Sequence, residues 1–389
     1  MPKNSSPVFS QIMSLLHPQA FARCAARHPL RREPRGLTRY DHFLALCFAQ
    51  LTHRRSLRDL CACLAAQPHY HLGFRGELTR TNLAYASRRR DWRLFAAVAE
   101  HLMQRARRLY APPPGPVELP ERALALDASL ILLSAKIFPW AAGGRRHATA
   151  VKLNLLLSLR GNVPAWASIT SGRRSDVKTL DELPVEPGCH YIMDRGYLDF
   201  SRLHQLHLRG GFFVVRSRRR FSFAVTASRP VDKQTSLRCD QTIRLANPQS
   251  RRGYPAPLRR VKIYDVKQHR SLALLTNQFG LPAATVAELY KQRWQVELFF
   301  KWIKQHLQLE CFLGQSPNAV YCQLWAAVCT HLLLAILKQE LKLSHSLYEI
   351  AQIISVRPFE QIPLAELLAK TTPAIEKDQN QNLFVFNDL

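Results

Sequence analysis

The chain has 389 residues, enough for about two or three domains, and its 55 Lys and Arg residues against 28 Asp and Glu residues leave a net charge of +27. Because 47% of the residues are hydrophobic, the composition excludes a disordered polycation, which lacks the apolar side chains needed for a core. Arg supplies 41 of the basic residues. A GC-rich coding sequence would explain Arg over Lys but not the charge surplus, which predicts nucleic acid as the partner.

The cysteines predict neither a disulfide framework nor a zinc site, because there are nine of them and none belongs to a CxxC motif. The amino-terminal residues lack the basic start and apolar run of a signal peptide, and no uninterrupted apolar stretch reaches about 18 residues. We therefore expect no membrane segment. The expected location is the cytoplasm, with association to the nucleoid when the protein binds DNA.

Residues 10 to about 110 read as a series of helices, since apolar residues recur at spacings of three and four. Within this module, Thr79 is expected to cap a short helix that follows a Gly-containing turn. The helix carries Arg80, Asn82, Arg88, Arg89 and Arg90. Two short helices joined by such a turn, the second rich in Arg and Asn, suit a helix that enters a DNA groove. The alternative is the solvated face of an ordinary helical bundle.

A proline-rich linker ends the helical module, because residues 111–120 contain five prolines and a glycine and cannot continue a helix. Beyond it, three strands are expected to form an antiparallel meander, with Gly161 and Asn162 as a hairpin turn. A short helix, a strand, an amphipathic helix and another strand follow, up to residue 216. This order is typical of an α/β protein.

Residues 217 to about 276 interrupt the regular pattern with short polar and β-rich runs, the last of which predicts a hairpin. A long helix is expected from Pro282 to about Glu310. The apolar helix 318–341 and a shorter helix follow, and the tail shows no helical period.

Two carboxylates stand out in the α/β segment. Asp127 lies in the first strand among apolar neighbours, and Asp194 ends the fourth strand. If strand four lies beside strand one, the two carboxylates are close enough to share a divalent cation. Taken singly, either Asp could instead be a surface residue or a turn former, so the prediction depends on the pair and on a third member.

The third member comes from the helix after Pro282. At about 100° per residue, Tyr290, Arg293, Glu297 and Lys304 project from one narrow stripe. This stripe borders the apolar stripe of the same helix, so we expect it to face inward along the sheet. The alternative is an ordinary ion pair between Arg293 and Glu297 on an amphipathic helix.

The spacing of Tyr290, Arg293, Glu297 and Lys304 resembles the Y-R-E-K signature of the IS-four family of insertion-sequence transposases. The resemblance extends to the DRGY run at 194–197, to Asp127 and to the helical amino-terminal module, over roughly residues 10–370. It implies an α/β fold: a ribonuclease-H-like mixed sheet with an inserted β-rich subdomain, preceded by an all-helical DNA-binding module and followed by C-terminal helices.

The resemblance also implies a site. Its catalytic triad would be Asp127, Asp194 and Glu297, and these residues would bind two Mg²⁺ or Mn²⁺ ions per active site. Tyr290, Arg293 and Lys304 would contact the DNA backbone, and Arg195 is a further candidate for DNA contact. The implied activity is DNA transposition by the cut-and-paste route, with cleavage at the transposon ends and strand transfer. An aromatic residue of the inserted block would hold a flipped base. That block contains no Trp between residues 217 and 276, which leaves Phe221, Phe223 and Tyr254 as candidates.

The expected division of the chain follows from these assignments. It comprises 1–112 as a helical DNA-binding module, 121–216 as the first part of the ribonuclease-H-like core, 217–276 as the inserted subdomain, 277–312 as the catalytic helix, 313–375 as C-terminal helices and 376–389 as a loose tail. Each chain carries one triad, whereas cutting two transposon ends requires two, so we expect a homodimer on DNA. The apolar helix 318–341 either forms that contact or packs in its own core.

Two other functions remain open. A ribonuclease-H-fold nuclease would use the same triad to cleave DNA without joining it. An inactive protein derived from a transposase would bind DNA as a regulator. The complete triad favours an enzyme, and the separate helical module favours a transposase over a nuclease.

Overall fold

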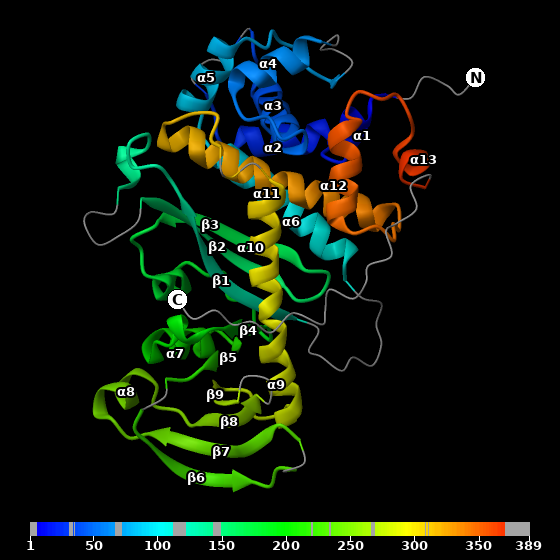
Figure 1. The fold of residues 1–389 in the computed structure, drawn as a ribbon. Helices are drawn as coiled ribbons and strands as arrows, with labels where there is room; N and C mark the ends of the chain where they lie inside the picture. The colour runs from blue at the N-terminus through cyan, green and yellow to red at the C-terminus, as the bar shows by residue number, and fades with distance from the viewer. Residues whose placement is uncertain are drawn as a thin grey trace.

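The computed structural model describes residues 6–30, 34, 36–66, 72–111, 122–142, 149–218, 221–232, 235–265, 269–307, 309 and 311–369. Helices gather at one end of the molecule and a mixed sheet extends from them to the other end (Figure 1). The predicted α/β class, with helices before and after a large mixed sheet, is confirmed. The linker 112–120 and the tail 376–389 lie outside the described residues.

The amino-terminal and carboxy-terminal helices form one body. The former are α1 (Val8–Ser14), α2 (Pro18–Ala26), α3 (Arg39–Leu51), α4 (Leu57–Ala65), α5 (Arg80–Arg89) and α6 (Arg93–Leu109), and the latter are α11 (Pro317–Glu340), α12 (Leu347–Val356) and α13 (Leu364–Ala369). They share one hydrophobic core. Backbone hydrogen bonds from Val8 and Phe9 to the carbonyls of Glu360 and Pro358 tie the two ends of the chain together. The sequence predicts residues 1–112 and 313–375 as separate parts and does not predict that they share a core.

The sheet contains every strand of the described chain in the order β3-β2-β1-β4-β5-β9-β8-β7-β6. The strands are β1 (Ala123–Leu132), β2 (Ala150–Ser158), β3 (Val163–Ser171), β4 (His190–Met193), β5 (Phe212–Arg216), β6 (Phe223–Arg229), β7 (Leu237–Leu245), β8 (Leu258–Asp265) and β9 (Arg270–Thr276). The first three form the predicted antiparallel meander, and β4 and β5 join β1 in parallel. The hairpin turn falls at Gly161 and Asn162, both with positive φ.

The β-rich block continues this sheet, because β9 pairs with β5 in antiparallel fashion and β8, β7 and β6 follow outward. The predicted hairpin is formed by β8 and β9. The helical segments between the strands are η2 (Pro139–Ala141), η3 (Asp176–Asp181), η4 (Arg195–Tyr197), α7 (Phe200–Leu208) and α8 (Pro248–Gly253).

Two helices run along one face of the sheet where one long helix was expected (Figure 1). They are α9 (Ala283–Gln292) and α10 (Trp294–His306), and they meet at Arg293. Around this residue the backbone bonds span three residues, from Arg293 N to Tyr290 O at 3.2 Å and from Val296 N to Arg293 O at 3.1 Å. The turn is therefore tighter than in an α-helix at the arginine of the Y-R-E-K pattern.

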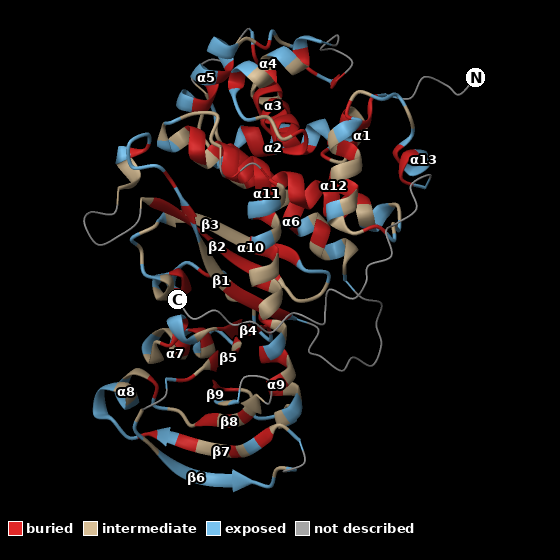
Figure 2. Ribbon diagram, viewed as in Figure 1, coloured by how far each residue is buried: buried red, intermediate tan, exposed pale blue. Residues whose placement is uncertain are grey.

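Helix α11 packs inside the chain's own core. It is long and apolar enough to cross a membrane by length and composition, yet 94% of its most apolar window is buried within the protein. In Figure 2 the helix is largely coloured as buried. Of the two expectations for this segment, packing in its own core is therefore the one that holds, and the helix offers little surface to a second chain.

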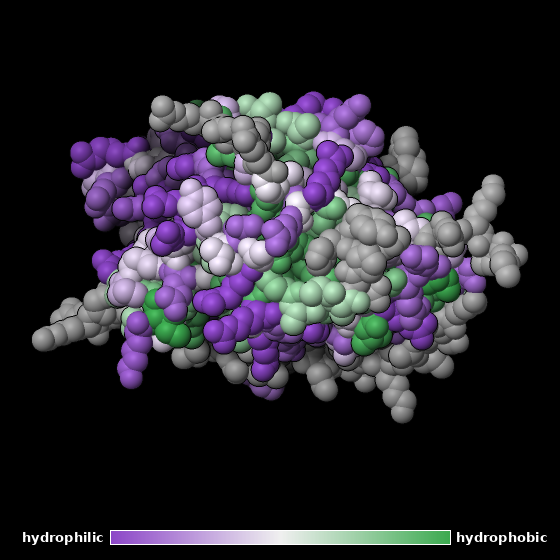
Figure 3. All heavy atoms as spheres, turned by 90° about the horizontal axis from the view of Figure 1, so that it is seen from above, coloured by the Kyte–Doolittle hydropathy of each residue, from purple (hydrophilic) through white to green (hydrophobic). Residues whose placement is uncertain are grey.

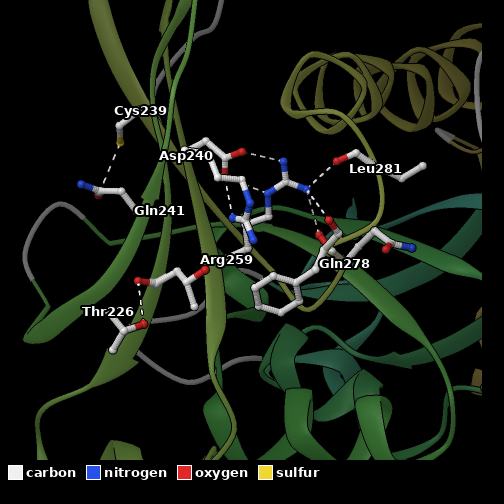
Figure 4. A network of polar contacts seen from close by, with 10 residues as sticks. Thr226, Cys239, Asp240, Gln241, Arg259, Gln278 and Leu281 are labelled. Atoms are coloured by element: carbon white, nitrogen blue, oxygen red, sulfur yellow. Dashed lines mark hydrogen bonds and ion pairs between the residues drawn. The ribbon is translucent and has the colours of Figure 1, made fainter.

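An ion pair inside the β-rich block holds the entry to α9 (Figure 4). Arg259 on β8 donates to both carboxylate oxygens of Asp240 on β7, at 2.8 and 2.7 Å. The same guanidinium donates to the carbonyl oxygens of Gln278 and Leu281, in the loop that leads into α9. Both side chains are almost fully buried. The network therefore fixes the outer strands to the start of the helix that carries Tyr290.

Candidate active site

The strand register brings the two predicted aspartates together. Strands β1 and β4 are parallel neighbours in which Leu126 is opposite Met193, and Asp127 and Asp194 are the next residues of the two strands. Side chains alternate between the faces of a sheet, so Asp127 shares the face of Ala125, against which α10 packs, and not the face of Leu126. The predicted adjacency of strand one and strand four is confirmed.

Arg293 joins the first and third members of the predicted triad. Its Nη1 lies 3.3 Å from Oδ2 of Asp127, and its Nη2 donates to Oε1 of Glu297, one turn further along. The Arg293 side chain is 9% exposed, against 20% for Asp127 and 31% for Glu297. The Y-R-E-K stripe therefore faces the sheet at this point, as the helical phase predicted.

Burial controls the charge of Asp127. It raises the pKa of this carboxyl to about 7; Arg293 and the hydrogen bond from the Ala128 N–H lower the pKa, whereas the charges of Asp194 and Glu297 raise it. The other two carboxylates are thus near enough to act on Asp127. Asp194 is held by its own turn, where its Oδ1 accepts the Gly196 N–H at 2.8 Å. A Cβ at residue 196 would lie only 3.0 Å from that oxygen, so a glycine fits this position.

Two tyrosines line the site. Tyr290 is buried, which raises its pKa, and its ring lies 6.0 Å from the Arg293 guanidinium carbon. Tyr197, from the DRGY run, has a buried hydroxyl with no hydrogen-bond partner in the described structure. Burial raises its pKa, and the charges of Asp127 and Asp194 raise it further, which places this hydroxyl near both carboxylates. Sequence reasoning quoted Tyr197 without giving it a role.

The donor set suits Mg²⁺ or Mn²⁺, because three carboxylates are hard oxygen ligands. Among the described residues, however, no three acidic, His or Cys side chains are close enough to hold a metal ion as they stand. Arg293 is the group that pairs with Asp127 and Glu297 instead. A metal fits this site chemically if the guanidinium withdraws.

A basic cleft adjoins the second aspartate. It has a volume of about 470 Å³ and no acidic residue in its described lining. Its basic residues are Arg195, Arg216, Arg218, Arg260, Lys262 and Arg270. Arg216, which sequence reasoning missed, ends β5; burial lowers its pKa, and the charges of Tyr290 and Asp194 raise it, which indicates that both lie nearby. A signal existed, because β4 and β5 are consecutive parallel strands whose carboxyl ends share one edge of the sheet.

The other DNA-contact candidates differ in accessibility. Lys304 on α10 is exposed, and partial burial of its amine lowers its pKa. On α5, which Thr79 caps as predicted, Arg80, Asn82, Arg88 and Arg89 are exposed. Arg90 differs from them, because its guanidinium donates to the carbonyls of Leu37 and Thr38. Its side chain therefore fastens the loop before α3 to the end of α5.

The aromatic candidates in the β-rich block also differ in whether they can reach a bound molecule. Tyr254 is 1% exposed, and its hydroxyl lies 2.8 Å from Nδ1 of His207. Phe221 and Phe223 line the basic cleft, with ring centroids 4.8 Å apart, and Arg260 lies over the Phe223 ring. Only the two phenylalanines are within reach of a molecule bound in the cleft.

The fold and the site together define an α/β domain with paired carboxylates at a sheet edge beside a basic cleft. Residues 118–333 match the family model described as a transposase DDE domain, and the chain belongs to this family. Residues 4–75 match a model described as a domain of unknown function (DUF4372). Membership in the first family implies dependence on a divalent metal ion.

The chain is similar to proteins named as transposases, two of them as transposases for insertion sequence elements. It is 33% identical over 216 residues to a protein of Sinorhizobium fredii named as the transposase y4zB (54% of this chain, 59% of the relative). It is 30% identical over 228 residues to one of Geobacillus stearothermophilus named as the transposase for element IS5377 (58% and 59%). It is 25% identical over 279 residues to one of Synechocystis named as the transposase for element IS4SA (68% and 74%).

The match therefore spans about three fifths of the length of the first two relatives. Among solved structures, a piggyBac transposase synaptic complex with hairpin DNA aligns with a TM-score of 0.43 and 9% identity, over 95% of this chain and 79% of that chain.

Proposed function

We propose that this chain is a DNA transposase that cleaves the ends of a mobile element and joins them to target DNA by the cut-and-paste route. The observation that carries the proposal is one constellation at the sheet edge. Arg293 joins Asp127 to Glu297, and Asp194 lies at the end of the neighbouring strand. Family membership and the excess of basic residues agree with this activity.

The proposed reaction needs an in-line oxygen nucleophile, a stabilised leaving oxygen and neutralisation of charge at phosphorus. Asp127, Asp194 and Glu297 would hold two Mg²⁺ or Mn²⁺ ions, which when bound would supply the charge neutralisation and the acidity for these steps. Arg293, once released from the carboxylates, would donate to phosphate oxygens of the DNA. Tyr290 would position the Arg293 guanidinium, and Lys304 would bind the backbone further along α10.

The basic cleft would hold the DNA strand that leaves the site. Arg195 and Arg216 would bind its phosphates beside Asp194, and the rings of Phe221 and Phe223 offer surfaces on which a base can stack. Tyr254 is a poor candidate for that task, because it is buried and paired with His207.

The working species would be a homodimer on DNA, since two element ends need two active sites and each chain supplies one. The contact would not come from α11, which is buried in its own core. The proposed substrate would place the protein in the cytoplasm, at the nucleoid when it binds DNA.

The test uses duplexes from the DNA that flanks the gene, with Mg²⁺ or Mn²⁺. We expect Asp127→Asn, Asp194→Asn and Glu297→Gln each to abolish cleavage while DNA binding persists. Asp199→Asn is the matched control, because Asp199 only caps α7 and pairs with Arg202, and Asn caps equally well. Joined products support a transposase. Cleavage without joining would indicate a nuclease, and binding without cleavage would indicate a regulator.

A further inference from the structure

A second basic groove lies between the amino-terminal helices α4 and α5 and the segment that connects α10 to α11, apart from the cleft at the triad. It has a volume of about 770 Å³. One wall is formed by the start of α4 and one face of α5, and the other wall by residues 312–316, between α10 and α11. Figure 3 views the molecule from this end, where hydrophilic residues surround and interrupt areas of hydrophobic residues. No residue of the proposed triad lines this groove.

The groove carries unbalanced positive charge. Arg55, Arg58, Arg80 and Arg88 line it, and all four side chains are exposed. In the described part of the chain none of the four forms an ion pair, and the groove lining contains no acidic residue. The acid on α4, Asp59, pairs with Arg54 and accepts the Arg55 backbone N–H. Four guanidinium groups without counter-charges predict an anionic ligand with several phosphates.

The backbone adds to the positive electrostatic potential of the groove. The helices α4, α5 and α11 all begin at the groove, since Ser56, Arg80 and Ser316 line it and stand at their amino-terminal ends. Helix amino-termini carry partial positive charge and favour phosphate groups. The macrodipoles of three helices therefore reinforce the four arginines.

The surface between the arginines suits deoxyribose. Leu57, Ala84, Leu313 and Gly314 contribute small or apolar groups, and the Tyr85 side chain, which is 61% exposed, stands at the groove. Alternation of guanidinium groups with apolar surface matches a sugar-phosphate backbone, in which charged phosphates alternate with apolar sugar faces.

Both walls are fixed to the rest of the molecule. Trp140, which follows β1, donates to the Gln315 carbonyl at 2.8 Å, and Phe138 packs on Phe312. On the other side, Asn318 of α11 donates to the carbonyls of Ser87 and Arg90, at 2.7 and 2.6 Å. The groove is therefore held in a constant position relative to β1, the strand that carries Asp127.

We propose that this groove binds the sugar-phosphate backbone of the element's terminal duplex away from the cleavage point, and so sets which phosphate reaches the triad. The inference rests on the proposed function and adds a second DNA site to it. It assigns Arg55, Arg58 and Tyr85 to DNA binding beside Arg80 and Arg88, and it makes the segment 312–316 part of the same site.

The experiment compares two double variants of the full chain that remove equal charge. Arg58→Gln with Arg88→Gln removes two of the four positive charges that line the groove. Arg251→Gln with Arg252→Gln is the control, because these exposed residues lie on α8 at the other end of the molecule (Figure 1). The probe is a labelled duplex of the sequence that flanks the gene, with an unrelated duplex as competitor.

Affinity is measured against salt concentration, and phosphate contacts are mapped by ethylation interference. We expect the groove variant to reduce the slope of log affinity against log salt by about 2, roughly one unit per lost phosphate contact, and the control to leave it nearly unchanged. The groove variant should also lose interference at phosphates distant from the cut, keep it at the scissile phosphate, and cut at more than one position.

The outcomes separate the two proposals. If the wild type cuts the probe and the groove variant matches the control in slope, footprint and cut position, the groove inference is wrong and the transposase proposal stands. If the wild type never cuts, but the groove variant alone loses the salt-dependent affinity, the groove is a DNA site in a protein that is not a transposase. If the wild type binds no duplex, both are wrong.

Discussion

Asp127 is the carboxyl whose protonation should govern the stability of the metal-free protein at neutral pH. Its pKa is raised to about 7 by burial. The folded chain holds this proton more tightly than the unfolded chain. The stabilising contribution of protonated Asp127 to the free energy of unfolding is therefore fully present below the unfolded pKa of about 4. It is lost as the pH rises through about 7.

We therefore expect Asp127→Asn to be more stable than the wild type at pH 8, by on the order of 2 to 4 kcal/mol, and about equal to it at pH 4. Urea unfolding with a chelator present, at several pH values, measures this difference. The exposed Glu77→Gln is the control and should follow the wild type. Equal pH dependence in Asp127→Asn and the wild type would show that Arg293 keeps the carboxyl charged.

Arg293 occupies the carboxylates that a metal would need. In protein without DNA, Arg293→Gln should therefore raise the affinity for Mn²⁺, by on the order of tenfold, or ~1.4 kcal/mol. Arg195→Gln is the matched control, since Arg195 is exposed beside Asp194 and lines the cleft without pairing to the triad. Titration calorimetry measures both. A weaker affinity in Arg293→Gln would mean that the arginine supports the carboxylate geometry instead of competing for it.

At the scale of elements, the ion pair of Asp240 and Arg259 holds the loop that leads into α9. Asp240→Asn leaves a buried guanidinium without its carboxylate, which costs about 3 to 5 kcal/mol. The double variant Asp240→Asn with Arg259→Met removes the buried charge and should recover much of that loss, although the carbonyls of Gln278 and Leu281 lose their donor. Thermal unfolding of the two variants tests this. Equal stability of the single variant and the wild type would contradict it.

Sequence periodicity predicted the elements that carry the site, because alternation and helical phase depend on neighbours along the chain. The position of Asp194 at a strand end made its pairing with Asp127 predictable. The break at Arg293 was not predictable, since it replaces one helical turn without changing the apolar pattern. Arg216 was overlooked although the shared edge of β4 and β5 was a signal for it. The pair of Asp240 and Arg259 was not predictable, because it depends on the register between β7 and β8.

At the scale of the whole molecule, the helices from the two ends of the chain depend on one another. Helix α11 is apolar on all sides, and it packs in one core with α3, α6 and the strands β2 and β3. Removal of the amino-terminal helices would expose that surface to water, which costs about 25 cal/mol of free energy for each Å² of apolar area. The amino-terminal module is therefore a structural half of the helical body as well as a candidate DNA-binding unit.

This union predicts different results from two ways of separating the module. A chain that starts at residue 122 should aggregate or unfold, because the side of α11 that packs against α3, α5 and α6 would lose its cover. A chain with a protease site inserted within residues 113–119, cut after folding, should stay together, because the shared core and the Asn318 hydrogen bonds to Ser87 and Arg90 hold the pieces. Size-exclusion chromatography with light scattering distinguishes them. Separation of the cut pieces into two soluble folded proteins would show that the module is an independent domain and that α11 does not need it.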